Sequence, residues 1–185
     1  MISSQHNGGA NSNTPLLYGM HTPTSLEQLA ALRQQWRDQH RTVVFTNGVF
    51  DLLHIGHLRY LEAARALGDM LVVGLNSDAS TRQIKGPPRP LIAEDERAAL
   101  LGGLRAVDYV TIFAEPTAEH LVAAIQPDVY VKGSDYRLGD GTAAPGKPLP
   151  EAVIVQGYGG RVQLIPYVAG RSTTELIQRI VEHYG

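Results

Sequence analysis

Short apolar runs alternate with longer amphipathic segments along most of the chain. The runs are rich in β-branched residues and are bounded by polar residues or glycine, which predicts buried strands at 41–47, 70–76, 107–113, 128–131 and 161–166. Around them, apolar residues recur at helical spacing, which predicts helices at 25–39, 55–67, 93–104, 117–126 and 172–184. Because strands and helices alternate, we expect an α/β fold, a Rossmann-like three-layer sandwich with a central parallel sheet of about five strands.

Capping residues mark the ends of several expected helices. Thr24 and Glu27 have the spacing of a capping box for the first helix, and Ser172 and Glu175 have it for the last. Gly68 is the expected C-terminal stop of the helix that begins at residue 55.

Two segments interrupt the alternation. Residues 85–90, with the sequence KGPPRP, are too rich in proline for a helix or strand, and residues 136–150 form a long loop to which we assign no function. In parallel α/β sheets, ligands bind at the carboxyl ends of the strands, where the loops between strands and helices meet. We therefore look for chemistry in the loops that follow the strands.

Composition narrows the class of protein. The chain has 185 residues and a net charge of -2, without a basic stripe that could neutralise nucleic acid, and no apolar run approaches a membrane span. We expect a disordered leader at 1–22, which is rich in Ser, Asn and Gly, and one domain at 23–185. The absence of cysteine excludes disulfides and is compatible with the expected cytoplasmic location.

The segment TNGVFDLLHIGH, residues 46–57, holds the first candidate chemistry. It ends a strand with Asn-Gly and opens a helix with His54 and His57 on one side of the first turn. A helix N-terminus suits a phosphate, and Gly56 lets a phosphate approach the backbone closely. Phosphate binding competes here with structural histidines and with a metal site, although zinc would need a third ligand that no nearby residue supplies with suitable spacing.

A second segment near the C-terminus supports the phosphate interpretation. The sequence GVFDLLHIGH resembles the HxGH motif of the nucleotidyltransferase superfamily, and GRSTTELI, residues 170–177, looks like the superfamily's second, triphosphate-binding segment. The two segments are about 115 residues apart, and each lies at an expected helix start. Together they are much more specific than either one alone.

Further segments narrow the resemblance to adenylyltransferases of the ADP-heptose pathway. These are GDMLVVGLNSDAS, KGPPRPLIAEDERAALL, VDYVTIFAEPTAEHL and PDVYVKGSDY, within a similarity over roughly residues 25–185. The resemblance implies transfer of an adenylyl group from ATP to D-glycero-β-D-manno-heptose 1-phosphate, with ADP-heptose and pyrophosphate as products. Some relatives carry this domain behind a sugar kinase, and the length here leads us to expect the stand-alone form. There are two alternatives. One is an enzyme that transfers the nucleotidyl group to another acceptor, such as glycerol 3-phosphate or phosphopantetheine, and the other is a catalytically silent nucleotide-binding regulator.

The resemblance also implies roles for individual residues. The expected catalytic residues are His54, His57 and Lys85. Besides both histidines, the expected nucleotide-binding residues are Thr46, Asn47, Gly48, Val49, Phe50, Lys132, Gly133, Ser134, Asp135, Gly170, Ser172, Thr173 and Thr174. The expected substrate-binding residues are Asp51, Lys85, Arg89 and Arg97.

Structural alternatives stay open for some of these residues. Asp51 could cap a loop, Lys85 could be a solvated loop lysine, and Arg97 could form a surface salt bridge. Ser172 and Thr173 can cap the last helix without a ligand, although a cap is compatible with a phosphate contact.

The remaining expectations concern base, metal and assembly. The family's cytidylyltransferases carry an Arg-Thr pair where this chain has YVAGRSTT, so recognition of cytosine loses support. Val49 stands where heptose relatives commonly have cysteine. We expect Mg²⁺ to arrive with ATP rather than in a dedicated protein site, since no carboxylate cluster is visible. The expected partners are ATP and a sugar 1-phosphate, and we expect a homo-oligomer, a dimer or higher.

Overall fold

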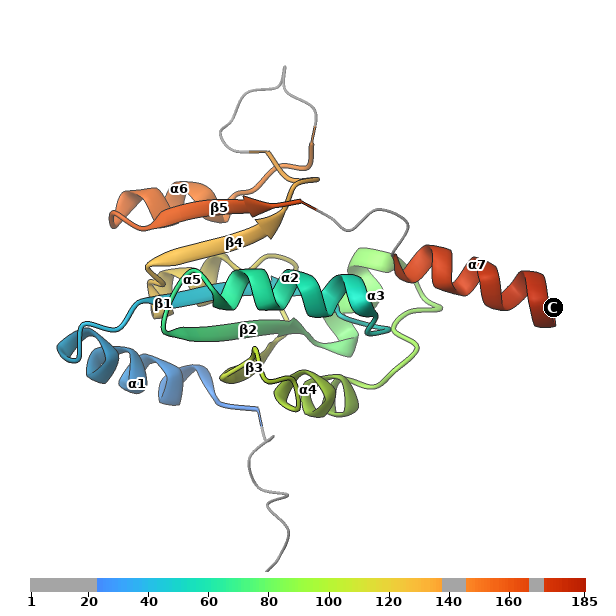
Figure 1. Cartoon of the computed structure of the whole chain (residues 1–185), viewed down its shortest axis with the longest axis horizontal. Coiled ribbons are helices and arrows are strands. Elements are labelled where there is room, and N and C mark those ends of the chain that lie inside the picture. The colour runs from blue at the N-terminus through green and yellow to red at the C-terminus, as the bar shows by residue number, and fades with distance from the viewer. Residues whose placement is uncertain (1–22, 138–145, 167–171) are drawn as a thin grey trace, which may run out of the picture.

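A five-stranded parallel sheet forms the centre of the protein (Figure 1). The computed structural model describes residues 23–137, 146–166 and 172–185. The sheet has the order β3-β2-β1-β4-β5, and its strands are β1 Val43–Gly48, β2 Met70–Asn76, β3 Tyr109–Phe113, β4 Val129–Gly133 and β5 Arg161–Ile165. The predicted five-stranded parallel sheet is therefore confirmed.

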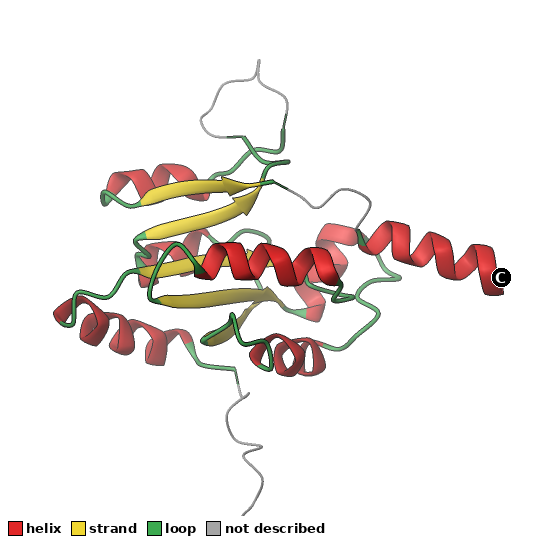
Figure 2. Cartoon of the chain, viewed as in Figure 1, coloured by secondary structure: helices red, strands yellow, loops and turns green. Residues whose placement is uncertain are grey.

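Helices cover both faces of the sheet (Figure 2). The helices are α1 Leu26–Asp38, α2 Ile55–Arg65, α3 Asp78–Lys85, α4 Glu94–Gly102, α5 Glu119–Ile125, α6 Glu151–Gly157 and α7 Thr173–Tyr184. Successive strand residues point to opposite faces, so Val43 and Phe45 pack with α1, α5 and α6, whereas Val44 packs with α2 and α4. This gives the expected three-layer sandwich.

Two helices escaped prediction. Helix α3 has few apolar residues and begins at Ser77, whose hydroxyl accepts a hydrogen bond from the backbone N–H of Ser80 (3.1 Å). Helix α6 is short and buries Ala152 and Val155. Because α3 continues through Lys85, that lysine ends a helix, and the irregular proline-rich loop begins only at Gly86.

Two predicted helix ends were wrong. The capping box of α1 is formed by Ser25 and Gln28, one residue later than the predicted pair Thr24 and Glu27. Helix α2 ends at Arg65 with Ala66 as its C-cap, before Gly68. A β-carbon at Gly68 would lie 2.7 Å from the carbonyl oxygen of Thr42, so glycine permits close chain packing there.

Helix α7 differs from the other helices because it buries no residue. It extends away from the sheet in Figure 1. Among the described residues, no helix is long and apolar enough to cross a membrane. The expected leader at 1–22 lies outside the described residues.

Candidate active site

The turn between β1 and α2 positions the two histidines. Phe50 has the left-handed backbone conformation, with φ +46°, and its buried ring meets the His57 ring edge-on with ring centres 5.3 Å apart. His54 caps α2 because its Nδ1 accepts a hydrogen bond from the backbone N–H of Gly56 (3.1 Å). With Nδ1 as the acceptor, the neutral His54 ring carries its proton on Nε2, which is a donor.

The two imidazole rings stack on each other, with ring centres 3.9 Å apart. Burial, and then the neighbouring His54, lower the pKa of His57 to about 4, while a backbone hydrogen bond with Leu52 acts in the opposite direction. Burial also lowers the pKa of His54, and nearby Glu175 opposes this shift. At neutral pH both rings are therefore uncharged in the free protein and can act as hydrogen-bond donors to a phosphate.

Acidification from pH 7 to pH 5 is expected to lower the free energy of unfolding by roughly 1–2 kcal/mol through His57. The pKa is 6.5 in the unfolded chain and about 4 in the folded one, so the unfolded state takes up the proton first. The stabilisation is complete above pH 6.5 and is lost as the pH falls toward 4. Urea unfolding at both pH values should show a smaller pH dependence for His57→Gln than for the wild type. An equal dependence would contradict the low pKa.

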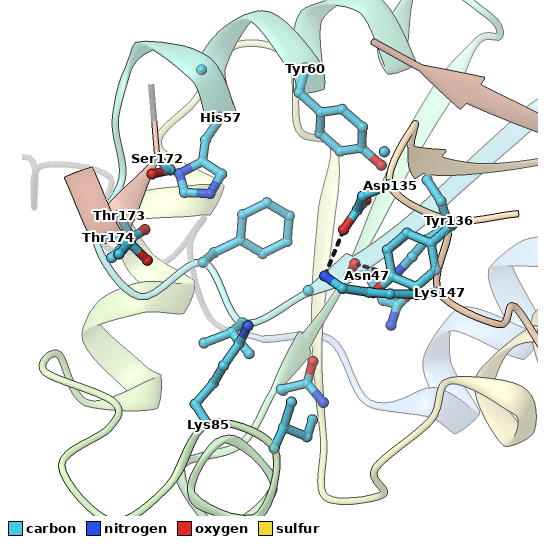
Figure 3. A pocket seen from close by; sticks show the side chains of 18 of the residues that line it. Asn47, His57, Tyr60, Lys85, Asp135, Tyr136, Lys147, Ser172, Thr173 and Thr174 are labelled. Atoms are coloured by element: carbon cyan, nitrogen blue, oxygen red, sulfur yellow. Dashed lines mark hydrogen bonds and ion pairs between the residues drawn. The ribbon is translucent and has the colours of Figure 1, made fainter. Parts of the chain in front are cut away.

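A cavity of about 910 Å³ lies at the carboxyl ends of the strands (Figure 3). It brings together expected site residues from four regions of the chain, namely Asn47, Gly48, Val49, Phe50, His54, His57, Lys85, Lys132, Gly133, Asp135, Ser172, Thr173 and Thr174. The β1–α2 motif and the start of α7 thus line one cavity, although they are far apart in sequence.

The start of α7 faces this cavity. Ser172 caps the helix by accepting a hydrogen bond from the backbone N–H of Glu175 (3.1 Å), as the sequence predicts. Thr173 and Thr174 follow it along the cavity wall. A helix N-terminus with free N–H groups and hydroxyl side chains is suited to an anion. Gly170, also expected here, lies outside the described residues.

A smaller cavity of about 260 Å³ adjoins His57 and contains Asp51, Lys85 and Arg89 among its walls. Asp51 is buried and accepts hydrogen bonds from the backbone N–H groups of Leu91 (2.7 Å) and Ile92 (3.2 Å). It also forms an ion pair with Arg89 at 2.6 Å. These contacts favour the loop-capping alternative for Asp51, and they leave Lys85 as the cation most available to a ligand.

Arg97 does not reach either cavity. It is fully buried and donates hydrogen bonds to the carbonyl oxygens of Ile92, Val49 and Asn76, and to the carboxylate of Asp78. The expectation that Arg97 contacts substrate at the cavity was therefore wrong. The salt bridge exists, with Asp78, but the arginine in it is buried and does not lie at the surface. The arginine instead joins the β1–α2 turn to the end of β2.

Two other expected residues also lie off the cavity wall. Thr46 is buried, and its hydroxyl is 2.7 Å from the hydroxyl of Tyr60. Ser134 is exposed and does not line the cavity, unlike its neighbours Gly133 and Asp135. The structure thus gives neither residue a direct position for nucleotide binding.

Several wall residues were not expected from the sequence. They are Tyr60, Asn76, Ile84, Pro116, Thr117, Tyr136, Lys147, Pro148, Pro150, Glu151 and Glu175. Tyr60 follows His57 by one helical turn, so helical spacing could have identified it. Lys147 reaches the cavity through a 2.6 Å ion pair with Asp135, and no sequence signal indicates that pairing.

Known proteins are similar to this chain in sequence. The cytidylyltransferase-like family model matches residues 45–153. The bifunctional protein HldE of Trichlorobacter lovleyi is 50% identical over 162 residues, which are 85% of this chain and 30% of that protein. HldE of Syntrophotalea carbinolica is 51% identical over 162 residues, 85% of this chain and 31% of that protein. The chain therefore spans about a third of the length of these relatives.

A solved structure adds to these similarities. The lipopolysaccharide core biosynthesis protein of Thermoplasma volcanium is 30% identical and superposes with a TM-score of 0.53, over 69% of this chain and 97% of that one. The sequence and structural similarities together support a nucleotidyltransferase. The chain belongs to the cytidylyltransferase-like family.

Proposed function

We propose that the protein transfers an adenylyl group from ATP to D-glycero-β-D-manno-heptose 1-phosphate, giving ADP-heptose and pyrophosphate for the lipopolysaccharide core. The observation that carries this proposal is the single cavity that joins the paired histidines, Lys85 and the start of α7. HldE relatives and the lipopolysaccharide core biosynthesis protein support the choice of sugar. We place the activity in the cytoplasm, where ATP is available, and the expected homo-oligomer stays a prediction.

The reaction needs positioning and charge stabilisation more than covalent catalysis. A phosphate oxygen of the sugar attacks the α-phosphorus of ATP in line, the new O–P bond forms, and the bond to the bridging oxygen breaks with pyrophosphate as the leaving group. His54 and His57 donate hydrogen bonds to the phosphate oxygens as charge develops, and the N-terminus of α7 holds the β- and γ-phosphates. The attacking phosphate is already an anion, so no general base is required.

Mg²⁺ would accompany the nucleotide. Within the part of the chain that the structure describes, no three His, Cys, Asp or Glu side chains gather to hold a metal ion. The residues facing the expected triphosphate include the donors Lys85, Ser172 and Thr173 and one carboxylate, Glu175. Bound to the triphosphate, Mg²⁺ would neutralise charge on the leaving pyrophosphate, while Lys85 and the start of α7 would hold the phosphates.

ATP is expected to be used at least about tenfold better than CTP in kcat/KM, a difference of about 1.4 kcal/mol. The reason is the sequence YVAGRSTT, which lacks the Arg-Thr pair of the family's cytidylyltransferases. Pyrophosphate release, measured for each nucleotide with heptose 1-phosphate, glycerol 3-phosphate and phosphopantetheine, tests both the base and the acceptor. Equal or better use of CTP would contradict the prediction. Turnover with another acceptor alone would overturn the proposed function.

A further inference from the structure

The amide side chain of Asn47, at the end of β1, is held by two groups from the neighbouring strand β4. The Tyr130 hydroxyl donates a hydrogen bond to Asn47 Oδ1 (2.7 Å), and Lys132 Nζ lies 3.2 Å from the same oxygen. Lys132 Nζ also lies 3.2 Å from the backbone carbonyl oxygen of Asn47. Strands β1 and β4 pair in parallel, which places these residues together.

These contacts determine which way the amide faces. An ammonium group can only donate, so the atom that faces Lys132 is the amide oxygen and not the nitrogen. Burial, and then Glu151, raise the pKa of Tyr130 well above its usual value, so its hydroxyl keeps the proton that it donates. Asn47 lines the cavity, and its amide nitrogen donates to no residue that the structure describes. The two N–H bonds are therefore available to a ligand.

Lys132 itself has little left to offer a ligand. It is only 6% exposed, and two of its N–H directions are taken by the two oxygens of Asn47. The ammonium also lies over the ring of Tyr136, 4.4 Å from the ring centre. Burial lowers the pKa of Lys132 to about 8, which leaves the group mainly protonated at pH 7. The lysine is thus placed to orient Asn47, although the sequence suggested that it binds nucleotide directly.

The position of Asn47 indicates which part of a nucleotide it meets. In Figure 3, His57 lies at one end of the pocket with Ser172, Thr173 and Thr174. Asn47 lies at the other end, with Asp135, Tyr136 and Lys147. If the first end holds the phosphates, the second holds the sugar and base of the nucleotide.

We propose that Asn47 donates a hydrogen bond to the nucleoside part of ATP, and that Lys132 and Tyr130 are positioning residues that present its N–H groups. This inference rests on the proposed function, because the phosphates define the ends of the cavity. The acceptor is the ribose ring oxygen or a ring nitrogen of the base, atoms that carry no proton and can only accept a hydrogen bond. Neither Tyr130 nor Lys132 touches the nucleotide.

The substitution Asn47→Asp tests the donor. Aspartate has the same shape and keeps an oxygen for Tyr130 and Lys132, but it turns a second oxygen toward the ligand in place of the NH₂ group. Titration calorimetry with Mg²⁺ should show ATP binding weakened by about 30-fold or more, since a hydrogen bond is replaced by repulsion between acceptors. Binding of inorganic tripolyphosphate should change less than about threefold, because its site is distant and solvent screens the added charge.

The outcomes separate this inference from the proposed function. If the wild type does not bind ATP, the proposed function is wrong, and the inference fails with it. If the wild type binds ATP and Asn47→Asp binds it equally well, the donor role is overturned while the proposed function stands. If tripolyphosphate binding falls as much as ATP binding, Asn47 faces the phosphates, and its assignment to the nucleoside is wrong.

Two further variants test the positioning residues. Tyr130→Phe removes one oxygen and keeps the buried ring, which stacks on Phe45 with ring centres 5.9 Å apart, so folding should be preserved. It should weaken ATP binding about three- to tenfold, and Lys132→Met should weaken it more, with tripolyphosphate binding unchanged in both. Equal loss of ATP and tripolyphosphate binding in Lys132→Met would show that the lysine contacts phosphate directly. Unchanged ATP binding in Tyr130→Phe and in Lys132→Met would overturn the positioning role.

Discussion

Replacement of His57 by alanine is expected to lower kcat about 100-fold or more, the usual effect of losing one preorganised donor to a transition state. The ring is held between His54 and Phe50, so it need not reorganise when charge develops on the phosphates. Its pKa of about 4 keeps the ring uncharged in the free protein. The ring therefore donates a hydrogen bond to the phosphates but does not attract other anions by its charge. The expected loss lies in kcat, with a smaller change in KM for ATP.

The measurement is pyrophosphate release with ATP and the sugar phosphate, together with a thermal unfolding scan of each variant. His120→Ala is the matched control, because His120 is an exposed histidine outside the cavity and should turn over like the wild type. In His57→Gln the side chain fills more of the space than alanine does. This variant therefore shows whether the lost side-chain volume, and not the lost imidazole, explains the fall in kcat. A well-folded His57→Ala variant with near-normal turnover would remove His57 from the mechanism.

Lys85→Ala is expected to lower kcat by about 100-fold while changing the affinity for ATP much less. Lys85 is an exposed residue at the end of α3, lines both cavities, and forms no ion pair with any described residue. Its ammonium is thus available to the attacking phosphate or to the departing pyrophosphate, where charge is greatest in the transition state. Lys85→Arg should restore only part of the rate, because a planar guanidinium does not replace a compact ammonium.

Arg82→Ala provides the control for Lys85. Arg82 is an exposed cation on the same helix, one turn earlier, and it lines neither cavity. Its removal lowers the local positive charge equally but should leave kcat within about twofold, because an exposed charge outside the site is screened by salt. If Lys85→Ala and Arg82→Ala lose the same activity, Lys85 acts only through the positive charge of this part of the surface and not through a contact with a phosphate. Normal turnover of Lys85→Ala would show that Lys85 is a solvated lysine without a role in the reaction.

The alternation of strands and helices was predictable because each element has its own apolar period. The central strands are buried on both faces and appear in the sequence as continuous apolar runs, as in 70–76. Helix α3 was missed because its buried residues, Ser80 and Thr81, are polar, and α6 was missed because its seven residues directly follow a loop rich in glycine and proline. The helix ends could not be predicted to the residue, because they depend on which side chain hydrogen-bonds to the backbone as a cap. Ser25 caps α1, although Thr24 was expected.

The site was predictable where its residues lie directly at the ends of elements. The histidine pair and Ser172 both occupy helix starts, so sequence order alone places them at the ligand edge. The functions of Arg97, Asn47 and Lys132 depend on contacts between segments that are distant in the chain. The order of the strands in the sheet cannot be read from the sequence, and the contacts of Lys132 with Asn47 exist only because β1 lies beside β4.

Helix α7 contributes the segment 172–174 to the cavity, yet no residue of this helix belongs to the buried core on either face of the sheet. The core that stabilises the sheet therefore does not depend on α7, whereas this wall of the cavity does. Stability and the shape of the cavity are thus determined by different parts of the chain, and a substitution on α7 can alter the cavity while leaving the free energy of unfolding nearly unchanged.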